Sequence, residues 1–110
     1  MPGAVEEFPF GEETSVFKAG GKLFALSALR ARPLTVSLKC EPELAEALRA
    51  THAAIRPGYH LNKRHWITVT LDGSVPDVTV LHLVQDSYDL VVAGLSAKRR
   101  ALLGNPEAAS

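Results

Sequence analysis

The sequence predicts an α+β fold in which an antiparallel sheet of about four or more strands is covered on one face by two helices. Two short runs of alternating apolar and polar residues flank Gly20-Gly21. A Gly-Gly pair is typical of a tight hairpin, because both central residues of a type I′ turn need positive φ. Two more alternating runs and two longer runs with apolar residues at helical spacing follow.

The strands are expected at residues 15–19, 22–28, 34–39 and 66–71. Each has one apolar face, which needs a cover, and one face rich in Ser, Thr and Lys. The apolar faces are built from Phe17, Phe24, Leu26, Val36, Leu38, Ile67 and Val69. The opposite face is expected to be flat and polar and to carry Thr35, Ser37, Lys39, Trp66, Thr68 and Thr70. A tryptophan among threonines either packs on its neighbours or stacks against a partner.

The helices are expected at residues 42–53 and 76–93, each beginning near a proline. The buried stripe of the first is Leu44, Leu48, Thr51 and Ile55, and Arg56-Pro57-Gly58 ends it. The second buries Leu81, Val84, Tyr88, Val91 and Leu95, exposes His82, Gln85, Asp86 and Asp89, and closes at Gly94. Residues 1–14 are expected to be an irregular, extended lead-in, because Pro9 and Gly11 interrupt any helical run.

Composition and charge set limits on the function. The chain has 110 residues, which predicts one domain over residues 1–110. Lys plus Arg equals Asp plus Glu at 12 each, so any nucleic-acid binding must depend on a local patch. A single cysteine, Cys40, excludes a disulfide framework and a cysteine-rich zinc site. No targeting or membrane-spanning segment is recognised, which favours the cytoplasm.

The residues best suited to bind a partner are concentrated at positions 56–66, which contain three Lys or Arg side chains, two histidines and two aromatics. Arginine and lysine suit phosphate oxygens, asparagine suits base edges or phosphates, and aromatics stack on bases. The candidate nucleic-acid-binding residues are Arg56, Tyr59, His60, Asn62, Lys63, Arg64, His65 and Trp66, with Lys39 from the neighbouring strand. The same loop is also typical of a solvated turn in which Tyr59 and Trp66 anchor the core, and short basic patches are weak motifs.

An enzyme is not expected. The sequence contains no Gly-rich phosphate loop, nucleophile elbow or HExxH motif, and its four histidines lack metal-ligand spacing. Cys40 lies between a strand and a helix, where a thiolate can be stabilised, but such a cysteine is more often a small buried apolar residue. No cofactor and no metal site are therefore expected.

An ordered series of short motifs resembles the MmcQ/YjbR family of small bacterial proteins. The series is Phe8-Pro9-Phe10-Gly11, Val16-Phe17-Lys18, Gly21-Lys22-Leu23-Phe24-Ala25, Leu38-Lys39-Cys40, residues 57–66, Asp72-Gly73-Ser74 and Ser87-Tyr88-Asp89-Leu90-Val91. The resemblance covers residues 2–100 and implies a frataxin-like (CyaY-like) fold and a non-catalytic, DNA-binding module. It also raises an alternative, an iron-binding or protein-interaction module with an acidic ridge, for which the dense carboxylates are Glu6, Glu7, Glu12 and Glu13.

The resemblance carries one departure. Family members place an amphipathic helix ahead of the Pro-Gly pair that stands here at Pro2-Gly3. Without that helix, part of the apolar sheet face would contact water, and exposed apolar patches drive association. We therefore expect either that Met1 is an internal start within a longer reading frame or that the chain forms a homodimer.

Overall fold

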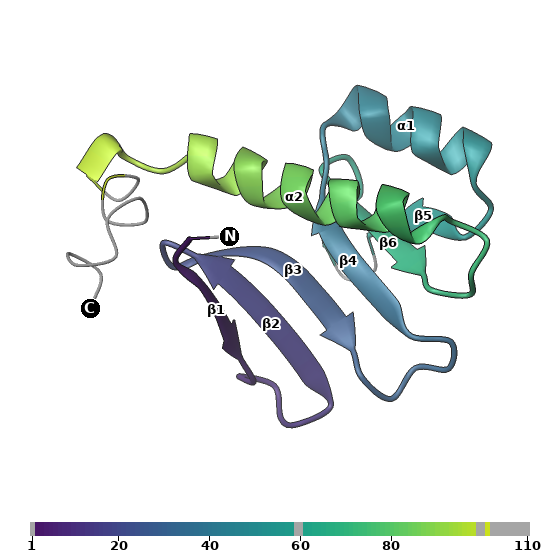
Figure 1. Ribbon diagram of the computed structural model, residues 1–110, viewed down its shortest axis with the longest axis horizontal. Helices are drawn as coiled ribbons and strands as arrows, with labels where there is room; N and C mark the ends of the chain where they lie inside the picture. The colour runs from purple at the N-terminus through teal and green to yellow at the C-terminus, as the bar shows by residue number, and fades with distance from the viewer. Residues whose placement is uncertain (1, 59–60, 99–100, 102–110) are drawn as a thin grey trace.

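The computed structural model describes residues 2–58, 61–98 and 101, and it has two layers (Figure 1). One layer is a six-stranded antiparallel sheet of order β1-β2-β3-β4-β6-β5. Its strands are β1 (Ala4–Glu7), β2 (Thr14–Ala19), β3 (Lys22–Ala28), β4 (Thr35–Lys39), β5 (Ile55–Pro57) and β6 (Trp66–Thr70). The other layer consists of α1 (Pro42–Thr51) and α2 (Asp77–Ala93). An α+β fold with helices on one sheet face is thus confirmed.

The core lies between the helices and one face of the sheet. Leu38, Ile67 and Val69 are 0% exposed and form its centre. Ala45 of α1 joins the same cluster, as do four side chains of α2 or its flanks, namely Val75, Leu83, Tyr88 and Val91. Helix α2 crosses β3 and β4, and α1 lies beside β5 (Figure 1). Neither helix covers the opposite face of the sheet, although Val16 and Ser37 on that face are only 2% and 5% exposed.

The predicted hairpin between β2 and β3 is confirmed. Gly20 and Gly21 have φ of 57° and 81°, the left-handed values that a type I′ turn requires. The two strands do not pair evenly, however. The register shifts between Phe17 and Lys18, so that Phe17 lies opposite Ala25, Lys18 lies opposite Leu23, and Phe24 is the extra residue of a bulge.

This bulge corrects the expected apolar face. Phe24 and Ala25 both turn toward the helices, and the Phe24 ring packs edge-on against Tyr88 at a centroid distance of 5.5 Å. Leu26 consequently lies opposite Ser37, on the open side of the sheet. Strict alternation placed Leu26 under the helices, and it is wrong by one residue because a bulge resets the period of two.

Two strands were not expected from the sequence. Residues 4–7, predicted as an irregular lead-in, pair with β2 as the edge strand β1. Ile55, predicted as the end of the first helix, pairs with Val69 in β5. Helix α1 ends earlier, with His52 as its C-cap in an extended conformation, so three residues suffice to turn back into the sheet. Both strands are short, and pairing with a longer neighbour outweighs their weak local signals.

Some of the expected helix faces are also wrong. In α1, Ala45 is buried whereas Leu44 is 41% exposed, and in α2 Leu81 is 66% exposed whereas Leu83 is buried. Tyr88, Val91 and Leu95 are buried as expected, and Gly94 caps α2. Leu48 and Val84 also pack against the core as expected, so the prediction fails only at Leu44, Thr51 and Leu81, where Ala45 and Leu83 take the buried positions instead.

Ser87 ties α2 to the sheet where β3 and β4 diverge. Its hydroxyl donates to the Phe24 carbonyl at 2.5 Å and accepts from the Lys39 N–H at 2.8 Å. The last printed pair of the β3–β4 ladder is Ala25 with Leu38, so Ser87 satisfies backbone groups beyond the end of that ladder. Within the described residues no helix is long and apolar enough to cross a membrane.

Candidate nucleic-acid interface

The uncovered sheet face carries the residues that the sequence singled out on β4 and β6. Antiparallel register places Lys39 directly opposite Trp66, and Ser37 opposite Thr68. Arg56 of β5 lies opposite Thr68 from the other side, which makes it a diagonal neighbour of Trp66. Since facing residues share one side of a sheet, Lys39, Trp66 and Arg56 project together from the open face. We call these three residues the Trp66 row.

Trp66 is held in place by the backbone beside it. The Gly58 N–H donates to the Trp66 carbonyl at 2.9 Å. A Cβ added to Gly58 would lie 2.5 Å from the Trp66 Cβ and 3.2 Å from its carbonyl carbon, so only glycine fits at this position. Trp66 itself is half-buried, which leaves part of the indole accessible to a partner.

The loop before β6 is a compact turn. The Asn62 side-chain oxygen accepts the Arg64 N–H at 2.9 Å, and its carbonyl accepts the His65 N–H at 3.1 Å. This side chain closes an Asx turn and is therefore used locally. Lys63, Arg64 and His65 are exposed around the turn. Tyr59 and His60, which the sequence also proposed as contacts, lie outside the described residues.

The loop is joined to the start of α1 by one backbone bond. The Cys40 N–H donates to the His65 carbonyl at 2.8 Å. Arg64 and His65 line a shallow hollow together with Lys39, and Lys63 lies with Arg64 beside Glu43 and Glu46 of α1. The register thus brings Lys39, Arg56 and Trp66 together, and the turn that contains Asn62, Lys63, Arg64 and His65 adjoins them on the side of α1.

Two cations at the other end of the sheet form ion pairs, whereas Lys22 and Arg32 there form none in the described chain. Lys18 pairs with Glu7 at 3.1 Å, and Arg30 pairs with Glu13 at 3.0 Å. Across the part of the chain that the structure describes, no carboxylate lies within 4.0 Å of the charged groups of Lys39, Arg56, Lys63 or Arg64. Carboxylates are nevertheless near, because Glu43 and Glu46 line the same shallow hollow as Lys63 and Arg64.

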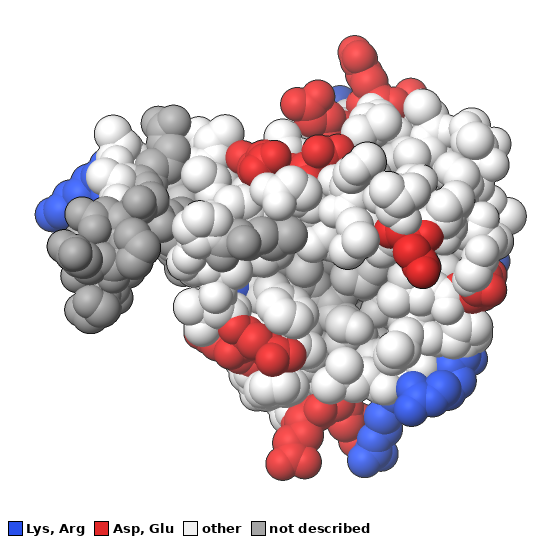
Figure 2. All heavy atoms as spheres, in the orientation of Figure 1, with Lys and Arg blue, Asp and Glu red and all other residues white. Residues whose placement is uncertain are grey.

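The helix-covered side has the opposite charge. Figure 2 shows this side, with carboxylates distributed over both helices and β1 and with Lys and Arg gathered chiefly at the rim. Exposed residues of α2 include Asp77, Asp86 and Asp89, and those of α1 include Glu43 and Glu46. The formal net charge of zero therefore conceals an uneven distribution of charge over the surface.

The acidic residues proposed for an iron ridge do not converge. Glu6 accepts a hydrogen bond from Ser15, Glu7 pairs with Lys18, and Glu13 pairs with Arg30. Among the described residues no three His, Cys, Asp or Glu side chains are grouped so that they could hold a metal ion. Hard cations need several converging oxygens, which this edge of the sheet does not supply in the described chain.

Cys40 is a buried core residue. It is 4% exposed, and burial raises the pKa of its thiol, with the nearby charges of Asp86 and Glu41 acting in the same direction. Arg49 opposes this shift more weakly. The thiol is therefore protonated near neutral pH, and a reactive thiolate, which the sequence had left open, is disfavoured.

Two features of the site were not foreseen. The close approach of Gly58 to Trp66 had only the Pro-Gly dipeptide as its signal, which indicated a turn. A cavity between the two helices, lined in part by Cys40, had no signal in the sequence. Its walls come from residues that are far apart in the chain, so only the folded structure brings them together.

Comparison with known proteins identifies the family to which this chain belongs. The model of the YjbR family matches residues 1–90. The Escherichia coli K12 protein YjbR is 45% identical over 103 residues, which span 93% of this chain and 86% of that protein. The protein YbdF of Escherichia coli O157:H7 is 44% identical over 93 residues, covering 84% of this chain and 75% of YbdF.

Solved structures show the same architecture. The crystal structure of Deinococcus radiodurans DR2400, a protein with a DUF419 domain, superposes with a TM-score of 0.89 at 46% identity. The matched region covers 94% of this chain and 80% of that one. A Pseudomonas syringae crystal structure matches with a TM-score of 0.69 at 29% identity, over 80% of this chain and 86% of the other. The names of these relatives state no activity.

Proposed function

The chain belongs to the YjbR family, and we propose that it is a non-catalytic DNA-binding module. One observation carries the proposal: the open sheet face presents an accessible tryptophan between a lysine and an arginine that have no carboxylate within ion-pair distance in the described chain. A flat face with an aromatic ring and flanking cations suits a base that stacks while its phosphates are neutralised.

The roles follow from position. Trp66 stacks on a base or sugar, and Lys39 and Arg56 contact the phosphates on either side. Lys63 and Arg64 extend the positive surface along the turn, and His65 adds charge when it is protonated. Asn62 has a structural role in this arrangement, because its side-chain oxygen is already bonded to the Arg64 N–H. Binding is expected to be weak, since few cations take part and carboxylates lie close by.

The single tryptophan makes the site directly observable. Trp66 is the only tryptophan of the chain, so its fluorescence reports on this face alone. Addition of an unlabelled single-stranded oligonucleotide should quench that emission in parallel with binding measured by anisotropy of a labelled strand. Trp66→Ala should weaken binding by about tenfold, corresponding to the roughly 1–3 kcal/mol of one stacked base. Binding that leaves Trp66 emission unchanged would place the DNA elsewhere.

The salt dependence tests the phosphate contacts. Three to four contacts give a log–log slope near −2 to −3, because each neutralised phosphate of a single strand contributes about −0.7. Replacing Lys63 and Arg64 by alanine should reduce the magnitude of the slope by about the contribution of two phosphate contacts. The matched control is Arg30→Ala with Arg32→Ala, which removes two cations from the loop at the opposite end of β4. Equal slopes in the two double variants would refute the assignment of the turn.

Two finer aspects belong to the same proposal. We propose that the fold is of the frataxin-like kind, which a superposition on a frataxin structure tests. We also propose a cytoplasmic location, since DNA is the partner, and cell fractionation tests it. The presence of the protein with DNA after crosslinking in cells would support both the location and the partner.

A further inference from the structure

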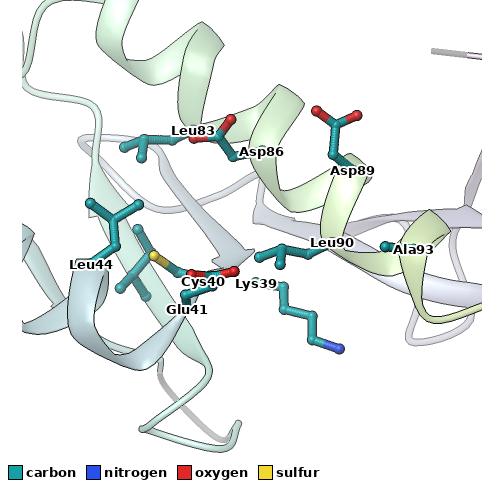
Figure 3. Close-up of a pocket in the computed structure, with 10 residues that line it drawn as sticks. Lys39, Cys40, Glu41, Leu44, Leu83, Asp86, Asp89, Leu90 and Ala93 are labelled. Carbon is teal, nitrogen blue, oxygen red and sulfur yellow. The ribbon is translucent and has the colours of Figure 1, made fainter.

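A cavity of about 330 Å³ opens between α1 and α2 on the helix-covered side. It shares Lys39 with the Trp66 row, whereas its other lining residues do not belong to the proposed DNA site. Leu44 and Leu83 form facing walls from the two helices, Ile67 contributes from the sheet, and the Cys40 sulfur points into the space between them (Figure 3). The volume lies at the small end of the usual range for ligand pockets, and the walls are mainly apolar.

The mouth of this cavity is acidic. Asp86 and Asp89 project from α2 and Glu41 from the start of α1 (Figure 3). Asp89 accepts a hydrogen bond from Gln85 at 2.9 Å, whereas Asp86 and Glu41 have no cation within 4.0 Å in the described residues. Lys39 also contributes to the lining, but its ammonium lies on the other side of Leu90 from Asp86 and Asp89 (Figure 3).

The negative potential reaches the interior. Asp86 and Glu41 both raise the pKa of the Cys40 thiol, next in importance to burial itself. Arg49 opposes them more weakly, and the apolar walls formed by Leu44, Leu83 and Ile67 leave less water beside these carboxylates than an open surface would. A bound positive charge at the mouth would therefore interact with these two carboxylates more strongly than it would on an open surface.

We propose that this cavity binds a small organic cation, an amine with an apolar body about the size of a hexyl chain or a benzene ring. The apolar body fills the space between Leu44, Leu83 and Ile67, and the ammonium lies at the mouth between Asp86 and Glu41. An anion of the same shape is repelled by the carboxylates. A bare metal ion gains nothing from apolar walls, so the two chemical features of the cavity together select an amphipathic amine.

Cys40 provides the measurement, because it is the only cysteine and lines the cavity. The full chain is alkylated with iodoacetamide, a neutral reagent, and the rate is followed by mass spectrometry. The probes are n-hexylamine, 1-hexanol and hexanoate, which share one apolar tail and differ in charge. Hexylamine should protect the thiol at a concentration about tenfold lower than hexanol, because bonds between charged partners exceed neutral ones by that order. Hexanoate should protect least.

Variants separate charge from shape. Asp86→Asn with Glu41→Gln should bring hexylamine and hexanol within about twofold of each other while leaving the protection by hexanol unchanged. The matched control, Glu12→Gln with Glu46→Gln, neutralises two exposed carboxylates outside the cavity lining and should preserve the preference for the amine. Backbone amide shifts of Leu83 and Leu90 on titration with hexylamine give a second readout that does not depend on thiol reactivity.

Two results would overturn the proposal. One is equal protection by all three probes, which would indicate a cavity without charge selection. The other is the absence of protection together with unshifted Leu83 and Leu90 amides, which would indicate that no ligand of this size enters.

Discussion

The two faces of the sheet are made by the same strands and differ in almost every other respect. On the helix side of β4 and β6, Leu38 and Val69 are completely buried. On the open side of those strands, Ser37 and Thr68 share a hydrogen bond of 2.9 Å, and no described layer lies above them. Because side chains alternate with a period of two, one short strand serves stability on one face and is available for binding on the other.

Charge follows the same division. The helix side carries carboxylates on both helices (Figure 2), and the open side near β6 carries Lys39 and Arg56 without a close carboxylate in the described chain. A ligand of either sign can therefore find a complementary surface on a protein of zero net charge. The comparison implies that substitutions on the helix side should change stability and those on the open side should change binding.

The largest expected effect is the loss of the Ser87 bridge. Ser87→Ala leaves the Lys39 N–H and the Phe24 carbonyl without a partner in a buried site. Each unsatisfied group costs about 1–3 kcal/mol, so the free energy of unfolding should fall by about 2–6 kcal/mol. Urea denaturation measures this change.

The exposed Ser74→Ala is the matched control, and its effect should stay within about 0.5 kcal/mol. The folded fraction of Ser87→Ala should bind DNA within about twofold of the parent chain, since Ser87 bonds to the backbone of Lys39 and Phe24 and to none of the proposed DNA-contacting side chains. A stable Ser87→Ala variant with strongly reduced DNA binding would break the division between the two faces.

The second largest effect is expected for Gly58→Ala, which should lower both the stability and the DNA affinity. Gly58→Ala places a methyl group where the Trp66 Cβ lies 2.5 Å away, so β5 and β6 must separate or Trp66 must move. Overpacking of this kind costs about 1–3 kcal/mol of stability. Trp66 emission should shift and DNA affinity should fall with it. Gly94→Ala is the control, because its nearest atoms lie at 3.5 Å and its backbone is right-handed.

Much of this fold follows from local patterns, and the errors have physical causes. Alternation located β2, β3, β4 and β6, and Gly20-Gly21 identified the hairpin. Alternation failed at Leu26, where the bulge at Phe24 reset the period. It gave no signal for β5, whose three residues are in a strand only because Ile55 pairs with Val69.

The candidate site was predictable to the extent that it is local. The loop sequence identified Lys63 and Arg64, and alternation placed Trp66 on the polar face. The arrangement of Lys39, Trp66 and Arg56 in one row depends on the register among three strands, which no local pattern determines. The cavity between α1 and α2 depends on how two helices pack, so it was out of reach of the sequence.

A third test compares cations on and off the open face. Arg56→Gln removes one positive charge next to Trp66, whereas Lys22→Gln removes one at the β2–β3 hairpin, on the end of a different strand pair. The first should weaken DNA binding and flatten the log–log salt slope by about 0.7, the contribution of one phosphate of a single strand. The second should leave the slope unchanged, as measured by anisotropy at several salt concentrations. Equal effects would mean that the protein attracts DNA without a defined site.

The smallest expected effect is a change in how stability depends on pH, caused by Cys40 on the helix side. Burial, followed by Asp86 and Glu41, raises the pKa of Cys40 above its ordinary value of 9.0 in the folded protein. Between the unfolded and the folded pKa, the unfolded chain releases this proton first, so stability declines as pH rises through that window. Below pH 9.0 the contribution is fully present.

Tyr88 limits the range in which this effect can be isolated. Its pKa is also raised above the ordinary value of 10.0, chiefly by burial and then by Asp89, and its proton adds a similar decline at higher pH. Urea denaturation from about pH 8 to about pH 10 therefore samples mainly the thiol.

Cys40→Ala lowers stability at every pH by removing a buried sulfur, but it should also make the decline over this range shallower. Asp86→Asn should do the same more weakly, since it removes one of the two charges that raise the pKa. An identical pH profile in the parent chain and in Cys40→Ala would show that the carboxylates at the cavity mouth do not act on its interior, and the contrast between an acidic helix side and a basic open face would then be confined to the surface.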